Sequence, residues 1–370
     1  MPLISVERLS ETDSWKLFKS CAFGNSTIES TLPPEVLDIG KKIAGKCHGH
    51  PLALKAFAAA MAGQTDPRQW RLALGRAEAD YSFFGNDNDA EKRISELLSS
   101  SYEFLPPILR MAFLYFAAFP ENHEARTADI IDIWNAERLI TAETPSELDV
   151  QGRRLLNIMI DRCVVEGVEV WPLGRVRKCK MRPMFRHLAL QILEKEDEDE
   201  GRTLFRAGNN LAEFPTKEIS QQKHQRISLM YNRITCLPEE FKCRGLRTLI
   251  LRHNESLSVI PAGFLKRLTW LRTLDLRMTG IESLPFTLGR LKSLEHLNVS
   301  RTKLKYLPEA VTRLHRLTSL NLFKCKELES VPPGMNKLED LRYLNLKHCV
   351  KLRFLPLEIT QIASLQCLIL

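Results

Sequence analysis

The sequence lacks the long apolar run and the paired cysteines that mark membrane proteins and disulfide scaffolds. No stretch approaches the roughly 18 consecutive apolar residues of a membrane-spanning helix. The nine cysteines are odd in number and scattered, without a C-x-x-C pair, which favours reduced thiols over disulfides or zinc ligands. Residues 1–18 contain acidic side chains and no apolar core of a signal peptide. These absences predict a cytoplasmic protein without a metal site.

A glycine-rich phosphate loop is also missing. The nearest approach is Gly40–Cys47, which almost spells G-x-x-x-x-G-K-[ST] but ends in cysteine, whose thiol cannot ligate magnesium as a hydroxyl does. No strand pattern precedes this segment, and its apolar residues recur at helical spacing. We therefore expect a helix here, no catalytic residues, and a protein that is not an enzyme.

What the sequence does contain is one unit repeated through residues 224–370. The unit reads L-x-x-L-x-L, and successive copies begin at Leu271, Leu294, Leu317 and Leu341. Spacings of 23, 23 and 24 residues are the leucine-rich-repeat period. The alternation predicts short strands with leucines on one face, and stacked units share one core. The copy beginning at Leu365 has no return limb, so we expect an apolar strand edge at Cys367–Leu370 that associates with other chains.

Two further ladders support the repeat. Prolines recur in one phase at positions 238, 261, 285, 308, 332 and 356, which an array of amphipathic helices would not tolerate. Three residues after the last strand leucine come side chains that can satisfy backbone groups at the turn: Asn232, Asn254, Thr279, Thr302, Cys325 and Cys349.

Residues that alternate with the buried leucines face the opposite side of each strand. We predict that they form a concave, solvent-exposed surface that binds protein. Ile250 and Phe323 stand out because exposed apolar side chains often mark contact sites. The predicted surface residues are Ser228, Met230, Ile250, Arg252, Asp275, Arg277, Asn298, Ser300, Asn321, Phe323, Asn345 and Lys347.

The net charge of +8 is unevenly spread. Residues 224–370 hold 24 Lys and Arg against 12 Asp and Glu, a net charge of +12, so the rest of the chain carries −4. A basic solenoid raises the question of nucleic acid. The basic residues lie mostly on turns without interleaved aromatics, which favours a solvated surface, with an acidic protein partner as the second interpretation.

The first half of the chain is predominantly helical. Residues 1–85 carry helical periodicity broken at Pro33-Pro34 and at Gly49-His50-Pro51. Residues 86–193 continue with helices and then a β-hairpin pattern, which suggests a winged-helix domain. The acidic run 194–202 opens a linker, 194–223, that enters the repeats. The predicted fold is multidomain, an α part followed by an α/β leucine-rich-repeat horseshoe.

Several motifs in order resemble one family, the plant nucleotide-binding leucine-rich-repeat (NLR) immune receptors of the coiled-coil type. Gly49–Leu54 looks like its GLPLAL motif, and Phe113–Glu121 looks like its CFLYCAAFPED motif. Leu9–Phe18 is similar to the segment that follows its nucleotide-binding core, and Ile133–Ile140 fits the next helix. The stretch Arg226–Met230 resembles the entry into its repeats.

The resemblance implies an ADP/ATP switch, yet the family's phosphate loop and magnesium-binding strand, expected before residue 1, are absent, as is the coiled coil. Its MHD motif reads Met181-Arg182-Pro183 here. By resemblance, Pro51 occupies the adenine-contact position and Arg182 stands near the ADP phosphate, so these two would carry any residual contact. The chain is expected to bind ADP weakly or not at all and to hold no cofactor of its own.

These observations favour an N-terminally truncated immune-receptor module that recognises protein: a pathogen effector, a host guardee or other NLR domains. The alternatives are a stand-alone leucine-rich-repeat scaffold, an incompletely recorded gene of a full ADP-binding NLR, an ATP-hydrolysing switch, and a winged helix that binds nucleic acid. The missing phosphate loop disfavours the ATPase, and residues 1–190 disfavour the stand-alone scaffold.

Overall fold

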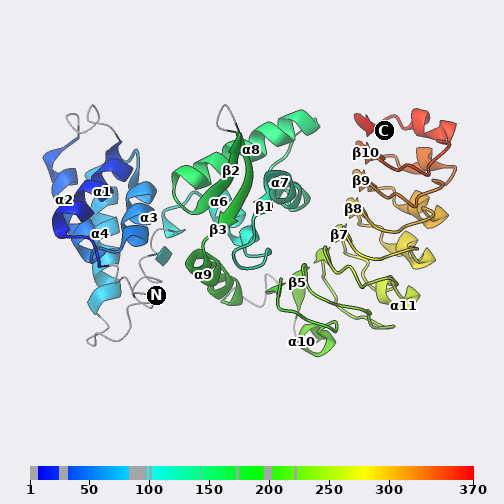
Figure 1. Ribbon diagram of the computed structural model, residues 1–370, viewed down its shortest axis with the longest axis horizontal. Coiled ribbons are helices and arrows are strands. Elements are labelled where there is room, and N and C mark those ends of the chain that lie inside the picture. The colour runs from blue at the N-terminus through cyan, green and yellow to red at the C-terminus, as the bar shows by residue number, and fades with distance from the viewer. Residues whose placement is uncertain are drawn as a thin grey trace, which may run out of the picture. The chain divides into compact units, whose positions relative to one another are not determined.

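The computed structural model of the chain contains helical and hairpin elements followed by a solenoid (Figure 1). It describes residues 7–24, 32–82, 98–99, 102–142, 144–171, 175–195, 202–220 and 223–370. Several residues from the sequence interpretation, among them the hairpin turn 172–174 and most of the acidic run, lie outside these ranges. No helix in the described part is long and apolar enough to cross a membrane.

By packing, the chain divides into two compact units, residues 1–113 with 153–189 and residues 114–152 with 190–370. This division cuts across the predicted range 86–193, and the boundaries drawn from sequence stay predictions. The first part of the chain holds α1 (Glu11–Phe23), α2 (Pro34–Lys46), α3 (Pro51–Met61) and α4 (Pro67–Ser82).

Helices α1 to α4 enclose a core that includes an aromatic cluster. Trp70 is fully buried, and its ring lies 5.4 Å from that of Phe23 and 6.4 Å from that of Phe18. The near-miss phosphate motif lies within α2 and at its end, as the helical periodicity predicts, and Gly40 packs against Trp15 and Trp70. The helix prediction for Gly40–Cys47 is therefore confirmed.

The break between α2 and α3 depends on Gly49. Its φ is +70°, and a Cβ atom there would lie 2.3 Å from the carbonyl oxygen of Leu9. The Leu9 amide donates to the Gly49 carbonyl at 3.0 Å, and this hydrogen bond holds the segment before α1 against the turn. Glycine is the residue that tolerates both the left-handed conformation and the close approach.

The predicted helices and hairpin of the middle region are confirmed. Strands β2 and β3 pair antiparallel, with Val165 opposite Met181 and Trp171 opposite Arg175. The elements are α6 (Pro107–Phe116), β1 (Ala125–Arg126), α7 (Thr127–Ala136), α8 (Pro145–Asp161), β2 (Val165–Trp171), β3 (Arg175–Met181) and α9 (Pro183–Glu194).

The repeats form one parallel sheet of eight strands in sequence order. Equivalent leucines align from strand to strand, as in the pairing of Leu274 with Leu297 and Leu297 with Leu320. The strands are β4 (Arg202–Phe205), β5 (His224–Ser228), β6 (Thr248–Ile250), β7 (Thr273–Asp275), β8 (His296–Asn298), β9 (Ser319–Asn321), β10 (Tyr343–Asn345) and β11 (Cys367–Ile369). Because β4 pairs with β5, the sheet begins one strand before residue 224, where the sequence places the first repeat.

The return limbs of the repeats carry short helices on the side away from the strands (Figure 1). These are α10 (Thr216–Ser220), α11 (Ala262–Leu265) and the 3₁₀ turns η3 (Phe286–Arg290), η4 (Glu309–Arg313), η5 (Met335–Lys337) and η6 (Leu357–Gln361). A prolyl residue directly precedes α11, η3, η4 and η6, so in these four limbs the recurring proline marks the start of the helical turn.

The ladder beside the leucines performs its predicted role. The Asn254 side chain accepts from the Ile234 amide at 3.1 Å and donates to the carbonyls of Leu229 and Leu251. The Thr302 hydroxyl donates to the carbonyl of Val299 at 2.8 Å. The thiols of Cys325 and Cys349 donate to carbonyls in the preceding rungs. These side chains therefore satisfy the hydrogen-bonding capacity of backbone groups that are buried in the solenoid.

Candidate protein-recognition surface

The first half of the concave face is covered by residues 114–152 of the same compact unit. Ser228 is fully buried, and its hydroxyl donates to the carbonyl of Ala118 at 3.1 Å. Glu137, just past the end of α7, accepts from the Arg226 Nε at 3.1 Å and from the Tyr115 hydroxyl at 2.6 Å. Its other oxygen accepts from the Thr248 hydroxyl. One carboxylate therefore ties together two strands of the sheet and the segment that covers them.

A buried charge cluster follows on the next rungs. The Asp129 carboxylate of α7 accepts two hydrogen bonds from the Arg126 guanidinium, of 3.1 and 2.8 Å. It also pairs with Arg277 from the sheet. Arg252 is 1% exposed and pairs with Asp275 of the neighbouring strand. Since desolvated charges persist only when paired, these contacts fix the position of α7 on the sheet.

The covering segment, residues 114–152, reaches as far as Glu295, the residue directly before β8. Arg138 holds Glu295 with two hydrogen bonds of 3.2 and 2.7 Å. Arg138 is largely exposed, whereas Glu295 is buried. Next to it, burial lowers the pKa of His296 to about 4. The two parallel hydrogen bonds fix the relative orientation of Arg138 and Glu295. This pair lies at the edge of the covered region.

A column of rings joins the covering segment to the turns of the first repeats. Phe119 stacks on His123, whose ring lies 4.4 Å from Tyr231, and Tyr231 stacks on His253 at 4.0 Å. Burial, followed by the nearby Arg252 guanidinium, lowers the pKa of His253 to about 4. Burial also lowers the pKa of His123 and raises that of Tyr231 to about 12. These pKa shifts all favour the neutral forms of His123, Tyr231 and His253.

This cover corrects part of the predicted recognition surface. The sequence interpretation expects every outward strand position to face solvent, but the following positions are buried: Ser228, Met230, Ile250, Arg252, Asp275, Arg277, Ser300 and Asn345. At the first rungs the reason is the chain itself, since α7 and its flanks occupy the space that solvent would fill. The prediction that Ile250 is exposed and marks a contact site is therefore wrong.

The second half of the concave face keeps the predicted exposure at four positions. Asn298, Asn321 and Phe323 are half-buried, and Lys347 is exposed. Asn298 and Asn321 sit opposite each other in register, and each accepts at 3.0 Å from the amide two residues ahead. The equivalent oxygen of Asn345 does the same, while its amide donates to the Tyr343 hydroxyl at 2.9 Å. We name Asn298, Asn321 and Asn345 the asparagine ladder. Their hydrogen bonds to the backbone make the concave surface polar and rigid at these positions.

The two residues implied in ADP contact do not form a phosphate cradle. Pro51 is the exposed first residue of α3. Arg182 follows β3 and directs its guanidinium toward Glu166 at 3.9 Å. In Gly40–Cys47, helix α2 uses the backbone amides for its own hydrogen bonds. The assignment of Pro51 and Arg182 as ADP contacts remains a prediction.

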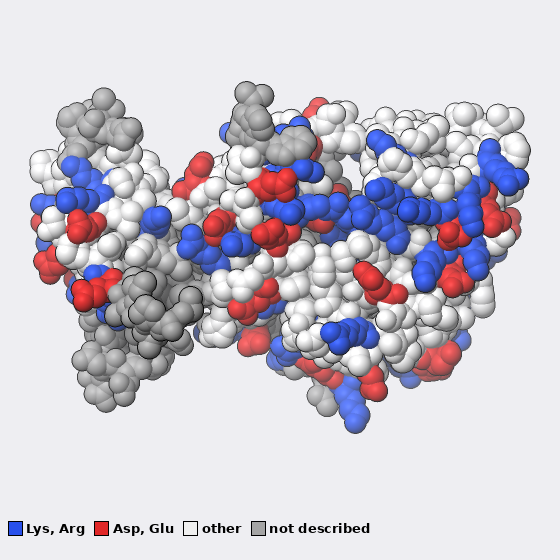
Figure 2. Space-filling model, viewed as in Figure 1, with Lys and Arg blue, Asp and Glu red and all other residues white. Residues whose placement is uncertain are grey.

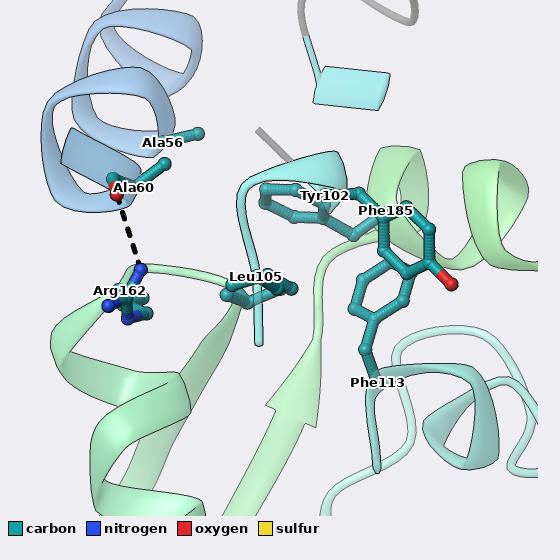
Figure 3. Close-up of a pocket in the computed structure, with 8 residues that line it drawn as sticks. Ala56, Ala60, Tyr102, Leu105, Phe113, Arg162 and Phe185 are labelled. Atoms are coloured by element: carbon teal, nitrogen blue, oxygen red, sulfur yellow. Dashed lines mark hydrogen bonds between the residues drawn. The ribbon is translucent and has the colours of Figure 1, made fainter. Parts of the chain in front are cut away.

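A cavity in the first unit is too small for a nucleotide (Figure 3). Its volume is about 10 Å³, room for about one water molecule. The rings of Tyr102 and Phe113 lie 5.2 Å apart, and Phe185 meets Phe113 edge to face. Arg162 donates to the Ala60 carbonyl at 3.3 Å, so this guanidinium closes the end of α3.

Sequence reasoning missed the residues that cover the first rungs, above all Asp129, Glu137 and Arg138. A signal was present: the outward strand positions Met230 and Ile250 are apolar, and Arg252 and Arg277 are cations that need an acidic partner. An acidic helix preceding the repeats was an available partner, but nothing in the spacing linked residue 129 to residue 277.

Comparison with known proteins agrees with this architecture. Residues 225–370 match the family described as leucine-rich repeat region. Residues 118–189 match the disease resistance protein winged helix domain. The two matches cover different parts of the chain and account for its repeats and its helix-and-hairpin region.

Curated relatives from Arabidopsis thaliana share most of the chain. The disease resistance protein At4g10780 is 31% identical over 323 residues, covering 80% of this chain and 35% of the relative. The disease resistance proteins SUMM2 and RPS5 are each 29% identical over 299 residues, covering 80% of this chain and 32% of each relative. The chain spans about a third of the length of these relatives. It belongs to the plant NLR-type disease resistance proteins, in the portion that carries the winged helix and the leucine-rich repeats.

Proposed function

We propose that this chain is a non-enzymatic recognition and regulatory module of a plant immune receptor that works in the cytoplasm. The observation that carries the proposal is the division of the concave face into a covered half and an open half. Relatives named for disease resistance support the immune role, and nine free thiols support a reducing compartment.

The open half is proposed to bind a protein, a pathogen effector or a host protein that an effector alters. Asn298, Asn321 and Phe323 offer hydrogen-bonding groups and an aromatic anchor on a rigid sheet, a combination typical of protein contact surfaces. The covered half is proposed to regulate: Asp129 and Glu137 hold α7 on the sheet, and a partner that competes for those rungs would release it.

Nucleotide chemistry is proposed to lie outside these residues. Helix α2 occupies the near-miss phosphate motif, and Arg182 faces Glu166, so the chain supplies no set of backbone donors for phosphate there. Calorimetry of residues 1–370 with ADP tests this proposal. We expect no micromolar binding and no ATP turnover, and micromolar affinity would overturn it.

Cross-linking in plant tissue tests recognition. The tagged chain is compared with a variant carrying Asn298→Arg and Asn321→Arg, which places bulky charge on the open half, outside the leucine core, and removes the two side-chain hydrogen bonds to the amides of Ser300 and Phe323. We expect an identified protein cross-linked through Lys347 in the parent and lost in the variant. A matched variant on the return limbs, Arg290→Gln with Arg313→Gln, should leave the cross-link unchanged. Equal cross-linking in all three proteins would contradict the proposal.

A further inference from the structure

The turn that follows each strand presents one side chain from an unusual backbone conformation. Non-glycine residues with φ between 54 and 64° recur at Tyr231, His253, Met278, Arg301, Lys324 and His348. The amides of the first five donate to the next repeat, as Arg301 does to the Phe323 carbonyl at 2.8 Å and Lys324 to the Lys347 carbonyl at 2.8 Å. The shared backbone conformation therefore places these side chains at equivalent positions along the rim of the concave face.

Along the first rungs this rim is covered, but along the last rungs it forms a cluster of cations around one ring. The Arg301 guanidinium lies 5.6 Å and the Lys324 ammonium 5.3 Å from the centroid of Phe323, and His348 approaches the ring at 65°. Lys347 follows on the next strand end and is exposed. We name Arg301, Phe323, Lys324, Lys347 and His348 the rim cluster.

The cations of the rim cluster lack acidic partners among the residues that the structure describes. Arg301, Lys324 and Lys347 have no carboxylate within 4 Å, and the buried Nε of Arg301 has no hydrogen-bond acceptor. In the same repeats Lys305 pairs with Glu282 at 3.0 Å, and Lys351 pairs with Glu327. Figure 2 shows Lys and Arg side chains gathered in a band over the repeats.

We propose that the rim cluster binds an acidic segment of the partner protein, with carboxylates on Arg301, Lys324 and Lys347 and an apolar side chain against Phe323. This inference rests on the proposed function and specifies the chemistry of the partner. Arg301 offers carboxylates a planar fork of donors, and the adjacent asparagine ladder offers amide groups to the same segment.

A protein segment fits the surroundings better than a nucleic acid. The rim cluster contains a single phenyl ring, Phe323, whereas binding of nucleic acid by stacking uses several rings for successive bases. Acidic residues on the same repeats, among them Glu282, Glu327 and Glu329, would repel a long phosphate backbone but not a short segment.

The test is a titration of the full chain with a fluorescent Asp-Glu decapeptide, acetylated and amidated, followed by anisotropy at low salt. A triple variant, Arg301→Gln, Lys324→Gln and Lys347→Gln, removes the rim charge. A matched triple variant, Lys292→Gln, Lys305→Gln and Lys351→Gln, removes the same charge from residues that already have partners on the repeats. A neutral Asn-Gln decapeptide and a 20-base-pair DNA duplex complete the set of probes.

We expect the rim variant to weaken binding of the acidic peptide by about tenfold and the matched variant by less than about twofold. Phe323→Leu should weaken a version of the peptide with a central tyrosine more than the tyrosine-free version. Equal losses in both triple variants, tighter binding of DNA than of the peptide, or no peptide binding would each overturn the inference. If those results came with a cross-link still lost in the Asn298→Arg and Asn321→Arg variant, the proposed recognition would stand and only the acidic chemistry would fail.

Discussion

The two halves of the concave face are built from the same repeat and differ in what lies on them. On the first rungs, Arg252 and Arg277 are buried against carboxylates from the sheet and from α7. On the last rungs, Arg301 and Lys324 crowd an aromatic ring without an acidic partner among the described residues. The repeat thus fixes where a side chain stands, while residues 114–152 of the same chain decide whether that side chain is buried and paired or left open.

The largest expected effect is on the covered half. Asp129→Asn removes the buried carboxylate that pairs with Arg277, which is also buried, and with Arg126, which is partly exposed. We expect the free energy of unfolding to fall by about 3–5 kcal/mol, measured by urea denaturation. The exposed pair of Glu282 and Lys305 serves as control, and Glu282→Gln should cost less than about 1 kcal/mol. Similar costs for the two variants would refute the burial of the cluster.

The ladder within the solenoid should show a smaller difference. Asn254→Ala removes three hydrogen bonds from buried backbone groups of the covered half, and we expect a loss of about 2–4 kcal/mol. Thr302→Val removes one such bond toward the open half and should cost about 1 kcal/mol. Thermal unfolding of both variants measures the contrast, which would disappear if the ladder were only a packing feature.

Acid should weaken the covered half through its ring column. The folded-state pKa of His253 is about 4, below the unfolded value of 6.5, so the folded state binds fewer protons between those values. The stabilising contribution is complete above pH 6.5 and is lost as pH falls toward 4. After allowance for partial exposure, we expect His253→Gln to reduce the loss of stability between pH 7 and pH 5 by about 1 kcal/mol. Parallel pH profiles of parent and variant would argue against a neutral ring column.

The smallest effect on stability is expected on the open half. Phe323→Ala and Lys347→Ala alter half-buried or exposed side chains outside the leucine core, so each should change the free energy of unfolding by less than about 1 kcal/mol. Their effect should appear in partner binding instead. A loss as large as that of Asp129→Asn would mean that this half is also structural.

The sequence predicted the solenoid because its determinants are local and periodic. Leucines at Leu274, Leu297 and Leu320 align in the sheet as their spacing requires, and the ladder at Asn254 and Thr302 bonds as expected. Helices α1 to α4 and the β2–β3 hairpin followed from periodicity and breaking residues for the same reason.

The burial of the outward side chains on the first repeats could not be predicted from local, periodic patterns. It depends on pairs such as Asp129 with Arg277 and Arg138 with Glu295, which are 148 and 157 residues apart. Alternation states which side of a strand a residue faces, but not whether another part of the chain lies there. Burial of charged groups depends on such distant partners.

Hydroxyl-radical footprinting read residue by residue tests the contrast most directly. Oxidation rates, corrected for the reactivity of each amino acid, are compared for Met230 and Ile250 on the covered half and for Phe323 and His348 on the open half. We predict strong protection of Met230 and Ile250, which are 0% and 3% exposed, and ready modification of Phe323 and His348. In the Asp129→Asn variant, the protection of Met230 should fall while Phe323 stays unchanged. Equal modification of the two halves in the parent protein would contradict the account.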